Sequence, residues 1–188
     1  VGPGASETKA RVSDGTAGVV SGVSESEVNL AVGLKLRDLL SAQGVTVVMC
    51  RDTQDIDISN SERASIANEA HADLFVRLHC DGVDDSSVSG ALMLVPGENE
   101  WTGPIVERSA RAGQLVQDAI IAETGANDRG IVERTDLSGF NWCEVPTILP
   151  EMGCMSNPTE DEKLTSDSYQ QELAQGICNG IMAYLEQE

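Results

Sequence analysis

The chain has 188 residues, of which 40% are hydrophobic and only 3% aromatic, so it can bury a sizeable aliphatic core within one domain. Its 12 Lys and Arg residues are outnumbered by 31 Asp and Glu residues, and the formal net charge is −19. A surface this acidic repels phosphate backbones and anionic lipids, which argues against nucleic acid and membrane surfaces as partners.

The first half of the chain predicts a loop followed by two helix–strand pairs. Residues 1–22 are rich in Gly, Ser, Ala and Thr and show no hydrophobic periodicity, which is typical of a loop. Ser24-x-x-Glu27 and Ser59-x-x-Glu62 are capping-box patterns, and each predicts the start of a helix. The predicted elements run in the order helix 24–43, strand 45–49, helix 59–70 and strand 74–79.

The second half continues the alternation of short strands with amphipathic helices. Its predicted elements are a strand over 90–95, a helix over 104–124, a strand over 145–149 and a last helix with an apolar stripe at Tyr169, Leu173, Ile177, Ile181 and Leu185. This alternation predicts an α/β fold with a largely parallel sheet. We expect residues 23–188 to form a single domain after the loop at 1–22.

The five cysteines, at positions 50, 80, 143, 154 and 178, do not predict a metal knuckle or a disulfide framework. Their number is odd, and no two of them form a Cys-x-x-Cys pair. We interpret Cys143, Cys154 and Cys178 as small apolar residues of the core.

Two predicted strands end in groups that can carry chemistry. Residues 74–78 lead into His79, and residues 145–150 lead into Glu151. Ligands of open α/β sheets bind beyond the carboxyl ends of the strands, so both side chains reach one edge if the strands are neighbours. Glu25, in the first turn of its helix, can face that edge too. A histidine with two carboxylates suits zinc hydrolysis, in which two groups bind the metal and another carboxylate handles the proton of water.

Each of these residues also has a structural explanation. The helix dipole favours an acidic residue such as Glu25 in a first turn, and a histidine at a strand end is often a half-exposed hydrogen-bonding group. Two further donors are excluded on geometry. Cys80 points to the face opposite His79, and His71 lies about 20 Å away at the far edge of the sheet.

Four stretches, in chain order, resemble the zinc-dependent N-acetylmuramoyl-L-alanine amidases, a family of bacterial cell-wall hydrolases. The stretches are SESEVNLAVGLKLRDLLSAQGVTVVMCRD (24–52), ISNSERASIANEAHADLFVRLHCDG (58–82), DRGIV (128–132) and VPTILPEMGCMSNPTEDEKL (145–164). The resemblance implies a mixed, mostly parallel sheet of about six strands flanked by helices on both faces, and one Zn²⁺ ion. Carried over by position, Glu25 and His79 match zinc ligands, and Glu151 matches the catalytic glutamate.

The sequence departs from the family pattern at three places. The family opens on a strand that ends in Asp-Pro-Gly-His, whose histidine is the first zinc ligand, and no such motif occurs here. We expect that strand and ligand to lie upstream of Val1, and therefore expect the 188-residue chain to bind zinc weakly or not at all and to have little activity. His71 stands where the family usually has glycine. Pro150 precedes Glu151 and is expected to fray or bulge that strand end.

The resemblance implies a peptidoglycan hydrolase, or autolysin, that cuts the amide between the lactyl group of N-acetylmuramic acid and L-alanine of the stem peptide. Two alternatives are a catalytically degenerate amidase-like domain, which binds peptidoglycan or a partner, and an unrelated α/β binding protein. Peptidoglycan lies outside the cytoplasm, so we expect a secreted or wall-associated monomer; the sequence itself contains no signal peptide and no transmembrane segment.

Overall fold

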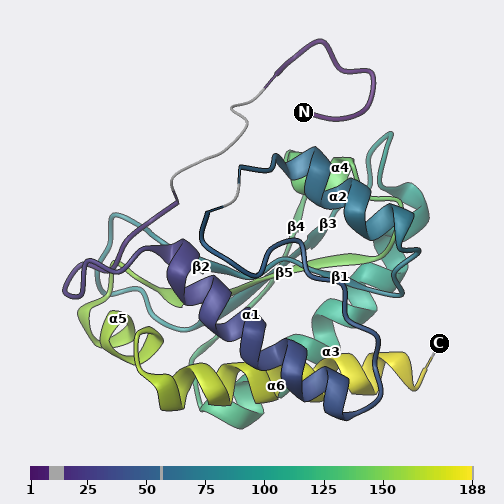
Figure 1. The fold of residues 1–188 in the computed structure, drawn as a ribbon. Helices are drawn as coiled ribbons and strands as arrows, with labels where there is room; N and C mark the ends of the chain where they lie inside the picture. Colours follow the sequence, from purple (N-terminus) through teal and green to yellow (C-terminus); the bar gives the residue numbers. More distant parts are fainter. Residues whose placement is uncertain (9–14, 56, 188) are drawn as a thin grey trace.

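The computed structural model describes residues 1–8, 15–55 and 57–187. The elements are α1 (Glu25–Ala42), α2 (Asn60–Glu69), β1 (Phe75–Val76), β2 (His79–Asp81), β3 (Ala91–Pro96), η1 (Gly103–Ile105), α3 (Val106–Thr124), β4 (Asp128–Arg134), α4 (Ser138–Asn141), β5 (Thr147–Cys154), α5 (Pro158–Leu164) and α6 (Asp167–Leu185). Figure 1 shows the sheet across the middle of the molecule, with α1, α3 and α6 below it and α2 and α4 above it. None of the helices in these three ranges is long and apolar enough to span a membrane.

The five strands form one mixed sheet in which three of the four pairings are parallel. β1 and β2 both pair with β5 in parallel, β3 pairs with β5 antiparallel, and β4 pairs with β3 in parallel. The predicted mixed, mostly parallel sheet with helices on both faces is therefore confirmed.

One predicted strand is wrong. Residues 45–49 have no ladder partner among the described residues and are not a strand. The sheet formed by the described residues therefore has five strands rather than about six. The sequence VTVVM has strong strand propensity, but a strand exists only when a neighbour supplies hydrogen bonds.

Pro150 acts on its own strand and on the neighbouring one. β5 runs without a break from Thr147 to Cys154, so this strand end does not fray. Its register against β2 shifts by one residue between Glu151 and Cys154, which is the bulge that Pro150 was expected to cause. The ladder between β5 and its parallel neighbour is also broken, because Arg77 N–H donates to the Ile148 carbonyl but Pro150, the next residue of β5 facing this way, has no N–H to give back. β1 and β2 are therefore two short pieces separated opposite Pro150.

The lower face of the sheet carries the main core. Met93, Val95, Ile148 and Met152 project from the strands into the layer formed by α1, α3 and α6, and each is at most 1% exposed. α3 and α6 meet almost backbone to backbone at two glycines of α6. A Cβ on Gly180 would lie 2.4 Å from the Cα of Val116, and one on Gly176 would lie 2.9 Å from the Cα of Ile120. Only glycine allows this approach.

The upper face is divided along the strands. Under α2 and α4 it is apolar: Phe75 packs with Ala64 and Ala67 of α2, and Leu94 and Leu149 pack with Phe140 of α4. Further along β2 and β5 the same face carries His79 and Glu151, which are register partners in parallel strands. Side chains of such partners leave the sheet on one face, so the fold brings these two together.

Candidate active site

Glu25 is the best-held carboxylate of the site. Ser24 caps α1 through a complete capping box with Glu27, which fixes Glu25 in the first helical turn. Glu25 is only 8% exposed, and its carboxylate accepts hydrogen bonds from the backbone N–H of Thr16 (3.1 Å) and of Cys80 (3.2 Å). Two segments from other parts of the chain thus converge on this one side chain.

These partners keep Glu25 ionised. Burial on its own raises the pKa of this carboxyl group, but the hydrogen bond and charge of His79, together with the two backbone donors, lower the pKa below its usual value. Gly15 makes room for the arrangement. Its φ is +71°, and a Cβ there would lie 2.6 Å from Glu25 Oε2.

His79 begins β2 and contacts Glu25 directly. Its Nδ1 lies 2.8 Å from Glu25 Oε1, and 38% of its side chain is exposed. With Nδ1 engaged by the carboxylate, Nε2 is the ring nitrogen left to face a ligand. The structure therefore joins two of the three predicted site residues in one contact.

Glu151 lies on β5, between His79 of β2 and Leu92 of β3. Its Oε2 is buried and has no hydrogen-bond partner among the described residues. Burial, followed by the negative charges of Asp81 and Glu25, raises the pKa of this carboxyl group to about 8, while Arg129 and Arg134 act in the opposite direction. A carboxyl group with a pKa near neutrality can both accept and return a proton, which is what acid–base catalysis needs.

An ion pair beside Glu151 was missed by the sequence reasoning. Arg129 Nη2 lies 2.9 Å from Asp81 Oδ2, and its Nη1 donates to Cys154 Sγ at 3.2 Å. Asp81 follows His79 by two residues, so strand alternation already placed both on one face. Arg129 comes from a distant part of the chain, and no local signal predicted it.

The two donors excluded on sequence grounds lie outside the site. Cys80 is 3% exposed and belongs to the lower-face core, as predicted. His71 is exposed at the end of α2 with a φ of +48°. A positive φ suits glycine, which explains physically why the resemblance implies glycine at this position.

Comparison with known proteins agrees with the fold. Residues 2–183 match the family described as N-acetylmuramoyl-L-alanine amidase. The chain belongs to this family. As an amidase of this family it is a cell-wall hydrolase, and the predicted family resemblance is confirmed.

Individual relatives cover most of this amidase. An uncharacterized protein of Bacillus subtilis, YqiI, is 32% identical over 170 residues, which are 90% of this chain and 78% of that protein. The N-acetylmuramoyl-L-alanine amidase Rv3717 of Mycobacterium tuberculosis is 30% identical over 88% of this chain and 70% of its own length. The apo form of the amidase Ami1 of Mycobacterium abscessus superposes with a TM-score of 0.86 at 29% identity, over 98% of this chain and 89% of that one.

The donor atoms of this amidase suit zinc in kind but not in number. The carboxylate of Glu25 and the imidazole of His79 are both groups that zinc binds. No cluster of three or more His, Cys, Asp or Glu residues able to hold a metal occurs in the part of the chain that the structure describes. Catalytic zinc sites use three protein ligands, of which Glu25 and His79 would supply two.

Proposed function

We propose that this amidase cleaves the amide between the lactyl group of N-acetylmuramic acid and L-alanine of the stem peptide, with zinc as its cofactor. The observation that carries the proposal is the contact between Glu25 and His79. Glu151 lies next to His79 across the β2–β5 pair, and the pKa of its carboxyl group is raised to about 8. Membership of the amidase family supports the substrate class.

Glu25 and His79 are the proposed zinc ligands of this chain. They would hold the cation together with a further protein ligand, which is needed to complete the set. Zinc, when bound, supplies a Lewis acid that polarises the amide carbonyl and lowers the pKa of water. The backbone donors from Thr16 and Cys80 orient the Glu25 carboxylate for this role.

Glu151 is the proposed proton carrier. In its ionised form the carboxylate accepts a proton from the attacking water, and in its neutral form it returns this proton to the departing amine of L-alanine. Its buried, unpartnered Oε2 is free for the transfer, because no group of the described chain competes for it. The two members of the nearby Asp81–Arg129 pair act on Glu151 in opposite directions, because Asp81 raises and Arg129 lowers the pKa of its carboxyl group.

The place of action follows from the substrate. Peptidoglycan is reached outside the cytoplasm, so we propose that the protein acts as a secreted or wall-associated monomer, with peptidoglycan or its muropeptides as its binding partner. Mixing the purified protein with isolated sacculi tests only binding. Cleavage has to be measured separately.

The test combines zinc content with muropeptide cleavage in three variants, each compared with its parent in a protein that contains the further histidine ligand. Glu151→Gln is expected to bind zinc as the wild type does and to lose cleavage by about 10²–10⁴-fold, because it keeps the shape but not the proton transfer. Glu25→Ala is expected to lose zinc. Glu133→Gln, which changes an exposed carboxylate on β4, is the matched control and should change neither property. Full cleavage by Glu151→Gln would contradict the assigned role.

A second candidate function is favoured by the two-ligand set itself. A degenerate amidase domain would bind peptidoglycan without cutting it. Under that alternative the 188-residue chain sediments with intact sacculi and releases no L-alanine amine even in excess zinc. Under the amidase proposal, sub-stoichiometric zinc in this chain rises to one equivalent, and cleavage appears, once a further histidine ligand is provided.

A further inference from the structure

Residues 16–25 form a short hairpin, the entry hairpin, which leads directly into α1. Ala17 and Ser24 make an antiparallel bridge within it. At its base lies Glu25, the first residue of α1 and a residue of the candidate active site. Movement of this hairpin therefore reaches the site.

The base of the entry hairpin is closed by a side chain rather than by the backbone alone. Glu25 N–H donates to the Thr16 carbonyl (2.9 Å), as in an antiparallel pair. The Glu25 carbonyl belongs to the first turn of α1 and points along the helix, so it cannot complete that pair. The Thr16 N–H donates to Glu25 Oε2 instead (3.1 Å).

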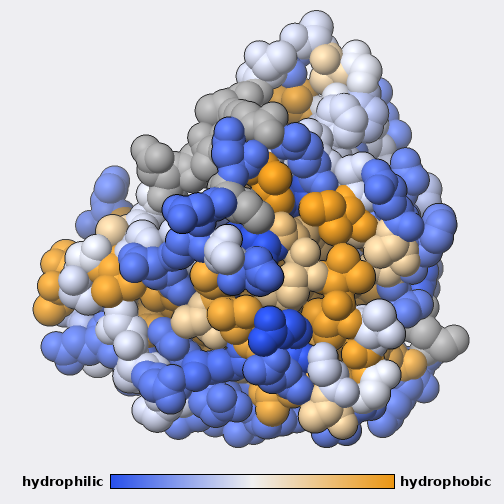
Figure 2. Space-filling model, viewed as in Figure 1, coloured by the Kyte–Doolittle hydropathy of each residue, from blue (hydrophilic) through white to orange (hydrophobic). Residues whose placement is uncertain are grey.

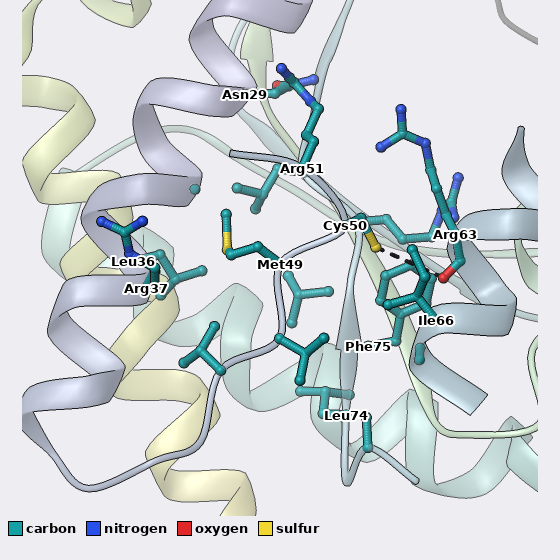
Figure 3. A pocket seen from close by; sticks show the side chains of 18 of the residues that line it. Asn29, Leu36, Arg37, Met49, Cys50, Arg51, Arg63, Ile66, Leu74 and Phe75 are labelled. Carbon is teal, nitrogen blue, oxygen red and sulfur yellow. Dashed lines mark hydrogen bonds between the residues drawn. The ribbon is translucent and has the colours of Figure 1, made fainter. Parts of the chain in front are cut away.

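The two oxygens of the Glu25 carboxylate are held unequally. Oε1 contacts His79 Nδ1 (2.8 Å) and accepts from Cys80 N–H (3.2 Å) and Asn29 Nδ2 (3.3 Å). Asn29 projects from α1 at one end of the pocket drawn in Figure 3. Oε2 accepts from Thr16, and no other described residue donates to it. The orientation of this carboxylate therefore depends on where the hairpin places Thr16.

The tip of the entry hairpin is fixed by one buried carboxylate from the far end of the chain. Asp161 Oδ2 accepts from the N–H groups of Val20 (2.7 Å) and Ser21 (2.8 Å), and Oδ1 accepts from Ser21 Oγ (2.6 Å). Asp161 is 0% exposed and lies in the first turn of α5, where the helix dipole favours a negative charge. Burial raises the pKa of its carboxyl group, but the hydrogen bonds lower it below its usual value.

Apolar burial does not hold the tip. Val19 and Val20 are each 59% exposed, and the tip stands apolar at the left margin of the molecule in Figures 1 and 2. The remaining anchor outside the hairpin is the Val19 N–H, which donates to the Met155 carbonyl (3.0 Å). Hydrogen bonds to an ionised group are stronger than those to a neutral one, so Asp161 is the main anchor.

Close contacts leave little slack between the tip and the base. A Cβ on Gly18 would overlap Asp161 Oδ1 and Ser21 Oγ, so only glycine lets the hairpin approach this carboxylate. At the base, a Cβ on Gly82 would lie 2.5 Å from Thr16 Oγ1. The hairpin is thus seated against α5 at one end and against the residue after β2 at the other.

We propose that Asp161 is a positioning residue for Glu25. By fixing the tip of the entry hairpin, it holds the Thr16 N–H on Glu25 Oε2 and so fixes the rotation of the carboxylate before a metal arrives. The consequence for metal binding rests on the proposed function, in which Glu25 is a zinc ligand. Donors that orient a ligating carboxylate typically change metal affinity when they are lost.

The first experiment measures amide hydrogen exchange by NMR in the 188-residue protein. In Asp161→Asn the amide group turns a donor toward the hairpin and the charge is lost. We expect the Thr16 amide to exchange faster by about 10-fold or more, and the Cδ resonance of Glu25 to shift at constant pH. An unchanged Thr16 amide overturns the proposal.

Glu160→Gln is the matched control for a general loss of stability. Glu160 is the neighbour of Asp161 on α5 and is 7% exposed, but it accepts from Gly90 N–H (2.8 Å) and Cys154 N–H (2.9 Å) instead of from the hairpin. It should speed exchange at those two amides and leave Thr16 as in the wild type. Equal acceleration of Thr16 in both variants would show that Asp161 acts only through global stability, which overturns the proposal.

Ser21→Ala keeps the test decisive if Asp161→Asn does not fold. It removes one of the three donors from an exposed residue and leaves Asp161 in place. The Thr16 amide should again exchange faster, by a smaller factor than in Asp161→Asn. In the double variant the two effects should not add, because both act through the same contact. Full additivity would contradict the pathway from Asp161 through the tip.

The zinc experiment uses the protein that contains the further histidine ligand, with zinc alone titrated against a competing chelator. Asp161→Asn should bind zinc more weakly by about 10-fold or more, and Glu160→Gln should bind it as the parent does. Glu25→Ala separates the two hypotheses. If it keeps the parent's affinity, the proposed function fails, and the role of Asp161 fails with it. If Glu25→Ala loses zinc while Asp161→Asn keeps it, only the positioning role is overturned.

Discussion

The two faces of the sheet differ in how their residues are satisfied. On the lower face, side chains of β3 and β5 are covered by α1, α3 and α6 and are almost fully buried in apolar contacts. On the upper face, β2 and β5 present His79 and Glu151, and the buried Oε2 of Glu151 has no partner within the described chain. One face of the sheet thus stabilises the fold. The other face carries reactive groups whose burial costs stability.

This contrast shows why the site can exist at all. A carboxyl group with its pKa raised to about 8 costs free energy whenever it ionises, and the protein tolerates that cost because the apolar face compensates for it. Substitutions on the lower face should therefore change stability, whereas substitutions on the upper face should change chemistry and pH dependence.

The largest effect on stability is expected from the lower face. Ile177 of α6 is fully buried, and Ile177→Ala should lower the free energy of unfolding by about 2–5 kcal/mol through lost burial and a cavity. Urea denaturation measures the change. Glu172→Ala, at an exposed position of the same helix, should alter it by less than about 0.5 kcal/mol. Equal changes in the free energy of unfolding for the two variants would contradict the assignment of stability to the lower face.

Glu151 should give the upper face a distinctive pH dependence. Its folded-state pKa of about 8 lies above the usual 4.5, so between these values the folded state holds a proton that the unfolded state has released. Stability should then fall as pH rises through this window, by about 2 kcal/mol between pH 6 and pH 8 from this group alone. Unfolding of the metal-free protein at several pH values, compared with Glu151→Gln, isolates the contribution. A rise in the wild type relative to Glu151→Gln would refute it.

Gly15 tests whether the loop over Glu25 belongs to the site. Gly15→Ala forces a side chain into a conformation with φ of +71° and into contact with Glu25 Oε2. We expect a loss of about 1–2 kcal/mol in stability. The ring resonances of His79 should shift in NMR spectra, since its carboxylate partner is displaced. Gly22→Ala has a similar φ of +70° but no neighbouring atom within 4 Å, so it should cost stability without moving His79.

The smallest effect is expected at His71. His71→Gly removes the strain of a positive φ at an exposed residue and should raise the free energy of unfolding by about 0.5–1 kcal/mol. Ala70→Gly, at the adjacent residue with a φ of −73°, should lower it instead. Chemical denaturation of both variants checks the opposite signs, and a gain in both would show that backbone strain is not the cause.

Local signals in the sequence predicted the elements whose causes are local. The capping boxes at Ser24 and Ser59 placed the starts of α1 and α2 to within a residue, because each motif satisfies its own helix end. The parallel pairing of β2 with β5 confirmed that His79 and Glu151 share one region of the sheet. Glu25 contacts His79 as the site hypothesis required.

Elements that depend on distant partners were not predicted. β4 has the sequence DRGIVER, with charges at both ends and little apolar alternation, and its identity as a strand comes from pairing with β3. Residues 45–49 show the reverse: their propensity is strong, but no partner completes a ladder there among the described residues. α5 has both a capping Asn157 and Pro158 in its first turn, so its signal was present in a segment too short to stand out by periodicity.

The two glycines of α6 also bear on the order of events during synthesis. α6 follows every other element in the chain, yet Gly176 and Gly180 seat it against the backbone of α3, and its buried residues close the lower-face core. Until this helix leaves the ribosome, the side of α3 that packs against it has no cover. This part of the nascent chain therefore becomes compact only after α6 has emerged.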